Sequence, residues 1–144
     1  MSKVRSEVII LKGCPIQSEG TAVAELSPGH IVELSGAENG VDVQSTAGKA
    51  TLLRIATANI FVGKSIEDAY AEGEIVYFCA LRPGDEAQAR LAAGTASISR
   101  GDQLQLSDDG TLAPLSSGTP VAEAIEAVDN SGGTAEAFIN IQAI

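Results

Sequence analysis

Residues 103–106, with the sequence Gln-Leu-Gln-Leu, and residues 137–141, Ala-Phe-Ile-Asn-Ile, decide the fold class of this chain. Apolar and polar side chains alternate in both stretches, which is the period of a strand with one buried face and one solvated face. Other short apolar runs cover residues 30–34, 40–44, 50–56, 74–81 and 88–91. The sequence of 144 residues therefore predicts a mainly β protein.

Turn-forming residues separate these runs. Residues 38–40, 82–85 and 108–110 contain Asn-Gly, Pro-Gly and Asp-Gly pairs, which supply the backbone conformations of tight turns. Aromatic residues make up only 3% of the chain and Trp is absent, so the core must consist mainly of Val, Ile, Leu and Ala. Many short strands joined by tight turns predict a compact β-barrel or β-sandwich-like body.

Two internal stretches and the N-terminal segment depart from the strand pattern. Residues 65–71 and 121–128 are rich in Ala, Glu and Ile, with apolar positions three and four apart, and predict one or two short helices. Residues 12–15, Lys-Gly-Cys-Pro, interrupt both helix and strand. We therefore expect an extended N-terminal arm over residues 1–25 and a β-rich body over residues 26–144.

Parts of the sequence resemble each other. Residues 29–35, which begin with Gly and end with Leu-Ser, parallel residues 101–107. At a different but constant offset, Val62, Ile66, Glu67 and Gly73 recur as Val121, Ile125, Glu126 and Gly132. Two interpretations remain open at this point: an internal duplication of one strand-helix-strand module, or a chance likeness between similar strand and turn units.

The charge of the chain limits the classes of partner that it can bind. The formal net charge is −10 and the sequence pI is about 4.4, so the surface repels nucleic acid phosphates and anionic lipid head groups. No apolar stretch approaches the ~20 residues that span a bilayer, and the N-terminal run lacks a secretory cleavage site. Cys14 and Cys79 lie in unrelated contexts, and reduced thiols in a cytoplasm-like compartment are favoured over a disulfide.

Two short motifs match known binding motifs only in part or in the wrong structural context. Gly63-Lys64-Ser65 matches the end of a phosphate-binding loop, but Ala58 stands where that loop needs a glycine, and bulky residues fill the space between. Residues 100–102, Arg-Gly-Asp, match an adhesion tripeptide but directly precede a predicted strand, where Gly and Asp are ordinary turn residues. Neither motif predicts nucleotide binding or cell adhesion.

The sequence also offers no obvious catalytic constellation. His30 is the only histidine, so one chain cannot assemble a Ser-His-Asp arrangement or a multi-histidine metal site. The acidic pairs at residues 67–68 and 108–109 lack the alternating ligand spacing of a calcium loop. We therefore expect no enzymatic activity, no cofactor and no metal.

Four weak motifs occur in an order that points to a family. Residues 82–86, 100–104, 109–112 and 121–127 place a Gly-Asp strand entry, an Asp-Gly turn and an Ala-rich segment before a final alternating strand. In this respect the chain, from about Ser27 onward, resembles the capsid decoration proteins of tailed bacteriophages, also called head cement proteins. Val121-Ala122 departs from the family, which often has a glycine there, whereas the first copy keeps Gly63.

The resemblance implies a partner and a location. Such proteins are β-rich homotrimers on the outer capsid surface of the virion, made in the host cytoplasm, and they bind the major capsid protein and stabilise the shell. The expected capsid contacts are Val8, Ile9, Ile10 and Leu11, which would add a strand to a capsid sheet edge. The alternative for this run is the first strand of the protein's own core.

Two functions of other classes stay open. One is a small trimeric enzyme with an inter-subunit active site that uses His30 and carboxylates of a neighbouring subunit. The other is a fibre-type carbohydrate-binding module. Sugar sites usually stack rings on aromatic side chains, and this chain has only two Tyr and three Phe.

Overall fold

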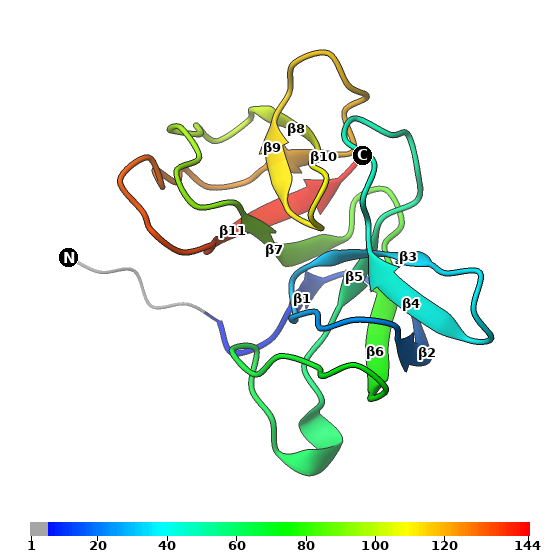
Figure 1. The fold of residues 1–144 in the computed structure, drawn as a ribbon. Helices are drawn as coiled ribbons and strands as arrows, with labels where there is room; N and C mark the ends of the chain where they lie inside the picture. The colour runs from blue at the N-terminus through cyan, green and yellow to red at the C-terminus, as the bar shows by residue number, and fades with distance from the viewer. Residues whose placement is uncertain (1–5) are drawn as a thin grey trace.

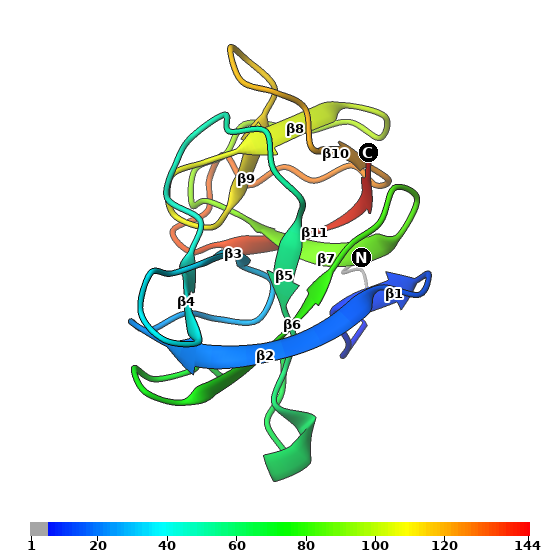
Figure 2. The same cartoon turned by 90° about the vertical axis from the view of Figure 1, so that its right-hand side faces the viewer.

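The computed structural model describes residues 6–144 and consists of two small β-barrels arranged in tandem (Figure 1). The first barrel closes in the order β2-β4-β3-β5-β6. Its strands are β2 (Ile16–Ala22), β3 (Ile31–Leu34), β4 (Gly40–Val43), β5 (Arg54–Ala56) and β6 (Ile75–Ala80). The chain then passes directly into the second barrel, which Figure 2 shows stacked on the first.

The second barrel is also built from five strands. Its strands are β7 (Glu86–Leu91), β8 (Gln103–Leu106), β9 (Leu112–Pro114), β10 (Ala122–Ala124) and β11 (Ala137–Ala143). The sheet order is β7-β11-β10-β8-β9, and a parallel pairing between Leu91 and Leu112 returns β9 to β7. A further strand, β1 (Ile10–Lys12), pairs antiparallel with β7 outside this ring.

The two barrels have the same topology. In each one, the first strand pairs parallel with the third and antiparallel with the fifth, as β2 does with β4 and β6, and as β7 does with β9 and β11. Residues 29–35 and 101–107, which resemble each other in sequence, lead into the equivalent strands β3 and β8. By contrast, Val62 follows β5 whereas Val121 precedes β10, so the constant-offset matches do not occupy equivalent places.

One apolar core runs through both barrels. Ile31, Ile55 and Leu81 of the first barrel share a buried cluster with Leu104 and Ile139 of the second. A smaller cluster fills the far side of the first barrel and contains Leu26, Val32, Val41, Tyr70, Val76 and Phe78. As expected from composition, aliphatic residues and Ala dominate. The alanines of β7 and β10 are fully buried, which lets neighbouring segments pack closely.

The predicted helices are not present in the part of the chain that the structure describes. Residues 65–71 form turns that end in a β-bridge between Tyr70 and Leu26. Residues 121–128 contain β10, which pairs with both β8 and β11. Pairing on both sides overrides the helix propensity of an Ala-Glu-Ala sequence. A single 3-10 turn, η1 (Ile60–Val62), is the helical element among residues 6–144.

The N-terminal segment also differs from the expected arm. Its first five residues lie outside the described part of the chain, but β1 pairs with β7 and β2 is a full member of the first barrel. The expected boundary between residues 25 and 26 therefore falls inside that barrel. Pairing with distant strands explains the difference, because β2 exposes the side chains of residues 16–19 and so carries little apolar signal.

Candidate protein-binding surface

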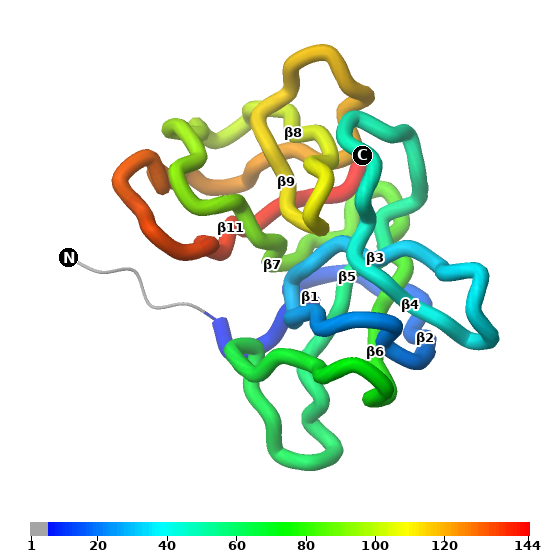
Figure 3. The backbone as a smooth tube through the Cα atoms, in the orientation of Figure 1, coloured from blue at the N-terminus to red at the C-terminus, as the bar shows by residue number. Residues whose placement is uncertain are grey.

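The connection between β5 and β6, residues 57–74, projects from the lower end of the first barrel (Figures 1 and 3). At its tip η1 presents Ile60, Phe61 and Val62, whose side chains are 70%, 69% and 65% exposed. Gly63 ends the turn in the left-handed conformation, with φ of 74°, which residues with a Cβ rarely adopt. Three consecutive bulky apolar side chains in solvent are unfavourable unless another molecule covers them.

Contacts with the barrel hold this tip in place. The ring of Phe61 packs on Tyr77 of β6, with centroids 5.0 Å apart and planes tilted by 51°. The buried Tyr70 hydroxyl donates a 2.6 Å hydrogen bond to the Thr57 carbonyl. Burial raises the pKa of Tyr70 to about 12, so this hydroxyl remains a donor at neutral pH. The apolar tip is therefore preformed.

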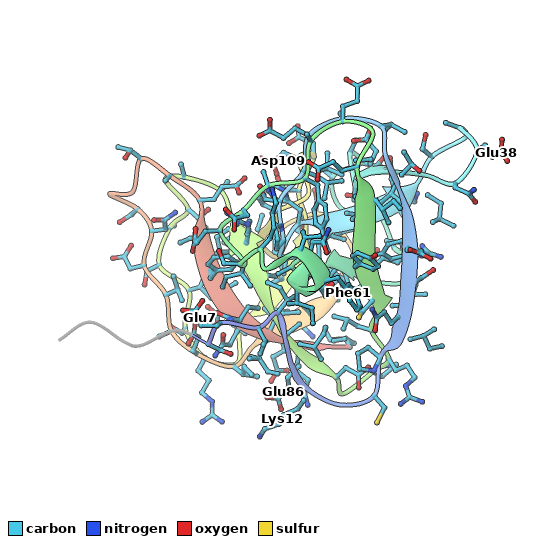
Figure 4. The ribbon with its side chains drawn as sticks, turned by 90° about the horizontal axis from the view of Figure 1, so that it is seen from below. Glu7, Lys12, Glu38, Phe61, Glu86 and Asp109 are labelled. Carbon is cyan, nitrogen blue, oxygen red and sulfur yellow. The ribbon has the colours of Figure 1, made fainter. Side chains whose placement is uncertain are left out.

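A groove of about 300 Å³ separates this tip from the N-terminal segment. Val8, Ile9 and Ile10 of the N-terminal segment line it together with Ala58, Ile60 and Phe61 of the β5–β6 connection, and Tyr77 and Cys79 also contribute. We call this feature the β1 groove. In Figure 4, which views the molecule from below, η1 with Phe61 faces the reader and Glu7 lies to one side of it.

The four residues that the sequence predicted as capsid contacts differ in their exposure to solvent. Val8 is 53% exposed, whereas Ile9 is only 2% exposed and belongs to the shared core. Ile10 and Leu11 are half-buried in β1. The groove thus brings Val8, Ile9 and Ile10 together with residues of η1, which were not predicted from the sequence. The feature of the sequence that could have identified them is the apolar run Ile60-Phe61-Val62 directly before the turn residue Gly63.

Gln88 anchors the N-terminal segment on the second barrel. Its side-chain amide nitrogen donates to the carbonyls of Ser6 and Val8, at 2.8 and 2.7 Å, and its backbone N–H donates to the carbonyl of Ile9 at 2.8 Å. Carbonyl oxygens only accept, so these contacts fix the orientation of the amide. Residues 6–9 are consequently part of the folded body.

The second barrel offers an internal comparison for the apolar tip. Its equivalent connection, residues 125–136 between β10 and β11, is shorter and contributes no large exposed apolar side chain. Instead Val128 forms a β-bridge with Ile98, and Glu126 is buried. The exposed Ile60-Phe61-Val62 tip is therefore an addition to the first barrel that the shared topology does not require.

His30 is part of a polar cluster between the barrels. Its Nδ1 accepts the Ser27 N–H at 3.0 Å, so the proton lies on Nε2, which donates to Glu136 at 2.9 Å. Arg90 completes the cluster: its Nε donates to the Pro28 carbonyl at 2.6 Å, and its guanidinium carbon lies 4.5 Å from the centre of the Phe138 ring. Both ring nitrogens of His30 are thus engaged within the chain, and neither is available as a general base.

This cluster changes the pKa of Glu136. Burial alone would raise the pKa, but the hydrogen bond from His30 and the positive charge of Arg90 hold it below its usual value. Glu136 therefore stays ionised at neutral pH and links loops of the first barrel to β7 and the segment before β11.

The remaining motifs have structural roles. In the Arg-Gly-Asp stretch, the Asp102 carboxylate accepts the Ser99 N–H at 2.8 Å and closes its own turn. Gly63 to Ser65 do not open a helix. Cys14 is exposed and Cys79 is buried, and both are free thiols. Within residues 6–144, no three His, Cys, Asp or Glu side chains gather as a metal site needs. In the same range, no helix is both long and apolar enough for a membrane span.

Comparison with known proteins identifies a similar fold. No family model matches the chain, and no curated protein matches its sequence. Among solved structures, the head fiber gp8.5 N base in bacteriophage phi29 is similar in structure, with a TM-score of 0.59 and 14% sequence identity. The match covers 91% of this chain and 95% of that one. The fold of two tandem β-barrels in this chain is thus similar to the fold of that fiber base.

Proposed function

We propose that this chain is a structural protein of a phage head, which decorates the outer surface of the capsid and stabilises it. The observation that carries the proposal is the fold shared with a head fiber base over almost the whole of both chains. The order of turn and strand motifs resembles that of capsid decoration proteins, and this supports the same class independently. The role is structural rather than catalytic.

The contact with the capsid is assigned to the apolar tip and the β1 groove. Ile60, Phe61 and Val62 stand out from an acidic body whose net charge of −10 opposes non-specific association with anionic surfaces. Large aromatic and aliphatic side chains of this kind commonly supply most of the energy of a protein interface. The partner is the major capsid protein.

Stabilisation of the shell follows from mass action. A protein that binds only the assembled, expanded lattice lowers the free energy of that state by its binding free energy at every occupied site. A homotrimer would engage several capsid subunits at once and gain affinity from linked binding events.

The experiment is co-sedimentation with expanded heads of the phage that carries this gene. Phe61→Ser should weaken binding by about tenfold or more, because it removes a large side chain from the contact. Leu34→Ser is the matched control, since Leu34 is 61% exposed, close to the 69% of Phe61. Leu34 lies beside the β3–β4 turn, and Glu38 of that turn is remote from Phe61 in Figure 4. Equal binding by the two variants would remove the tip from the contact, and no binding by the unmodified protein would refute the function.

A further inference from the structure

We propose that the β1 groove binds an extended, apolar segment of the partner protein, which adds to the free edge of β1 as a new strand. This inference rests on the proposed function, because the partner is taken to be the capsid. It reverses the role expected from the sequence: β1 is fixed in the body and receives a strand, whereas the sequence predicted that it would leave the body and donate one.

The first argument is the position of β1 in the sheet. Every other strand among residues 6–144 belongs to one of the two rings, whereas β1 pairs with β7 alone and ends the sheet order. An unpaired edge presents backbone donors and acceptors that readily pair with another chain, and proteins usually protect such edges with charge, proline or a bulge. In β1 the charge of Lys12 and a shift of register between Ile10 and Lys12 lie at the C-terminal end, whereas residues 8–11 contain neither charge nor proline.

The second argument is the direction of the backbone groups of Ile10. Ile10 stands opposite Ala87, and the Gln88 N–H donates to the carbonyl of the preceding residue, Ile9. In an antiparallel ladder this pattern makes Ile10 and Ala87 a non-hydrogen-bonded pair. The N–H and C=O of Ile10 therefore point away from β7, toward the free edge.

The third argument is the chemistry of the groove beside that edge. Its walls contain the apolar side chains of Val8, Ala58 and Phe61, which suit the alternate side chains of an added strand. Glu7 is the one carboxylate that lines it, and neither Lys nor Arg does. Together with the net charge of −10, this favours an occupant that is apolar within the groove and carries a basic residue near Glu7.

The test changes one backbone atom. Gly13-Cys14 is a suitable junction for native chemical ligation, so the full chain can be assembled from a synthetic peptide 1–13 and a recombinant fragment 14–144, and then refolded. In one variant an ester replaces the amide N–H of Ile10, with the side chain unchanged. In the matched control the ester replaces the N–H of Val8, which bonds locally to the Ser6 hydroxyl at 3.3 Å.

The Ile10 ester also weakens the Ile9 carbonyl, which accepts the Gln88 N–H, so urea unfolding first checks that both esters are folded. Binding to expanded heads should then fall about three- to tenfold for the Ile10 ester, the effect of one lost hydrogen bond to the partner, and remain unchanged for the Val8 ester. Hydrogen exchange supplies the second measurement. The Ile10 amide should exchange rapidly in the free protein and become protected both on heads and with millimolar acetyl-Lys-Val-Thr-Val-Thr-amide as a peptide probe.

The outcomes separate the two proposals. If heads bind but the Ile10 ester has no effect, and the Ile10 amide of the unmodified protein gains no protection, the inference is wrong and the function stands. If heads do not bind but the peptide protects the Ile10 amide, the function is wrong and the strand-accepting groove stands. Protection of Ile10 that grows with the concentration of free protein would assign the groove to a second copy of this chain and overturn the inference.

Discussion

Arg90 shows how a single side chain can connect two barrels. It extends from β7 and donates to the carbonyls of Pro28 and Ile66, at 2.6 and 3.1 Å, while its other side faces Phe138 and Glu136. The planar guanidinium can make these contacts at the same time, which the single ammonium of a lysine cannot. No periodicity or spacing in the sequence marks Arg90 for this role, because its partners are backbone groups of distant loops.

The Glu136 carboxylate makes part of this connection dependent on pH. Its pKa is held below the ordinary value of 4.5, so ionised Glu136 stabilises the folded state above the unfolded pKa. That contribution is lost as the pH falls through the lower, folded pKa. We expect Glu136→Gln to reduce the free energy of unfolding at pH 6 to 7, and the difference from the unmodified protein to shrink as the pH falls below 4.5 and through the lower, folded pKa.

Urea unfolding of both proteins between pH 3 and 7 measures this difference. Glu38→Gln is the control, since it makes the same change at an exposed carboxylate in the β3–β4 turn. A difference for Glu136→Gln that stays constant over the whole pH range would show that ionisation of Glu136 does not contribute.

Gln105 illustrates the limit of strand alternation. The pattern of residues 103–106 predicted that both glutamines face solvent, and Gln103 does. Gln105 is only 8% exposed, because its side-chain oxygen accepts the N–H groups of Ser116 and Gly118 at 2.8 and 2.9 Å. The polar side chain at this position accepts hydrogen bonds from backbone N–H groups of a loop that covers it. A pattern of alternating residues cannot identify that loop.

At the scale of elements, β1 and the residues before it contribute both to the stability of the fold and to the proposed binding site. Its neighbour Ile9 is buried in the shared core, whereas Val8 beside it is half in solvent. We expect Ile9→Ala to lower the free energy of unfolding by about 2–5 kcal/mol, the usual cost of truncating a buried isoleucine. Val8→Ala should change it by no more than about 0.5 kcal/mol.

Thermal or urea unfolding distinguishes these two variants, and head binding should show the opposite ranking once both are folded. Both residues line the β1 groove, but Val8 is 53% exposed and Ile9 only 2%, so truncation of Val8 should weaken binding more than truncation of Ile9. Equal stability of the two variants would mean that the N-terminal segment is detachable after all.

Strands with a clear apolar run were predictable from the sequence. The predicted runs at residues 30–34, 40–44 and 74–81 correspond to β3, β4 and β6, and the run at 103–106 coincides with β8. The turn at residues 38–40 is confirmed by Asn39, which has a φ of 54°. These features depend on local chemistry alone, and local chemistry is what a sequence displays.

Short or weakly apolar strands were not predictable. β9 and β10 have three residues each, too few to establish a period, and β10 has good helix formers. Their strand conformation arises from pairing with β8 and β11, which is a property of the assembled barrel. Only part of the site was predicted for the same reason, since Val8 and Ile10 meet η1 only once β1 has paired with β7 of the second barrel.

At the scale of the whole molecule, self-association bears most directly on the proposed function. We expect a homotrimer at micromolar concentration, with a mass of about three times 14.7 kDa by light scattering coupled to size exclusion. Because the chain carries a net charge of −10, raising the salt concentration should favour the trimer. A mass near 14.7 kDa at all salt concentrations would contradict both expectations.

The pairing of β1 with β7 also sets an order for folding during synthesis. Strands β2 to β6 leave the ribosome together and contain all the partners of the first barrel, so that barrel can close early. β1 is translated before any of them, but its partner belongs to the second barrel and emerges last of this group. Until then the nascent chain carries Val8-Ile9-Ile10-Leu11 uncovered, which makes this run the natural target of a chaperone.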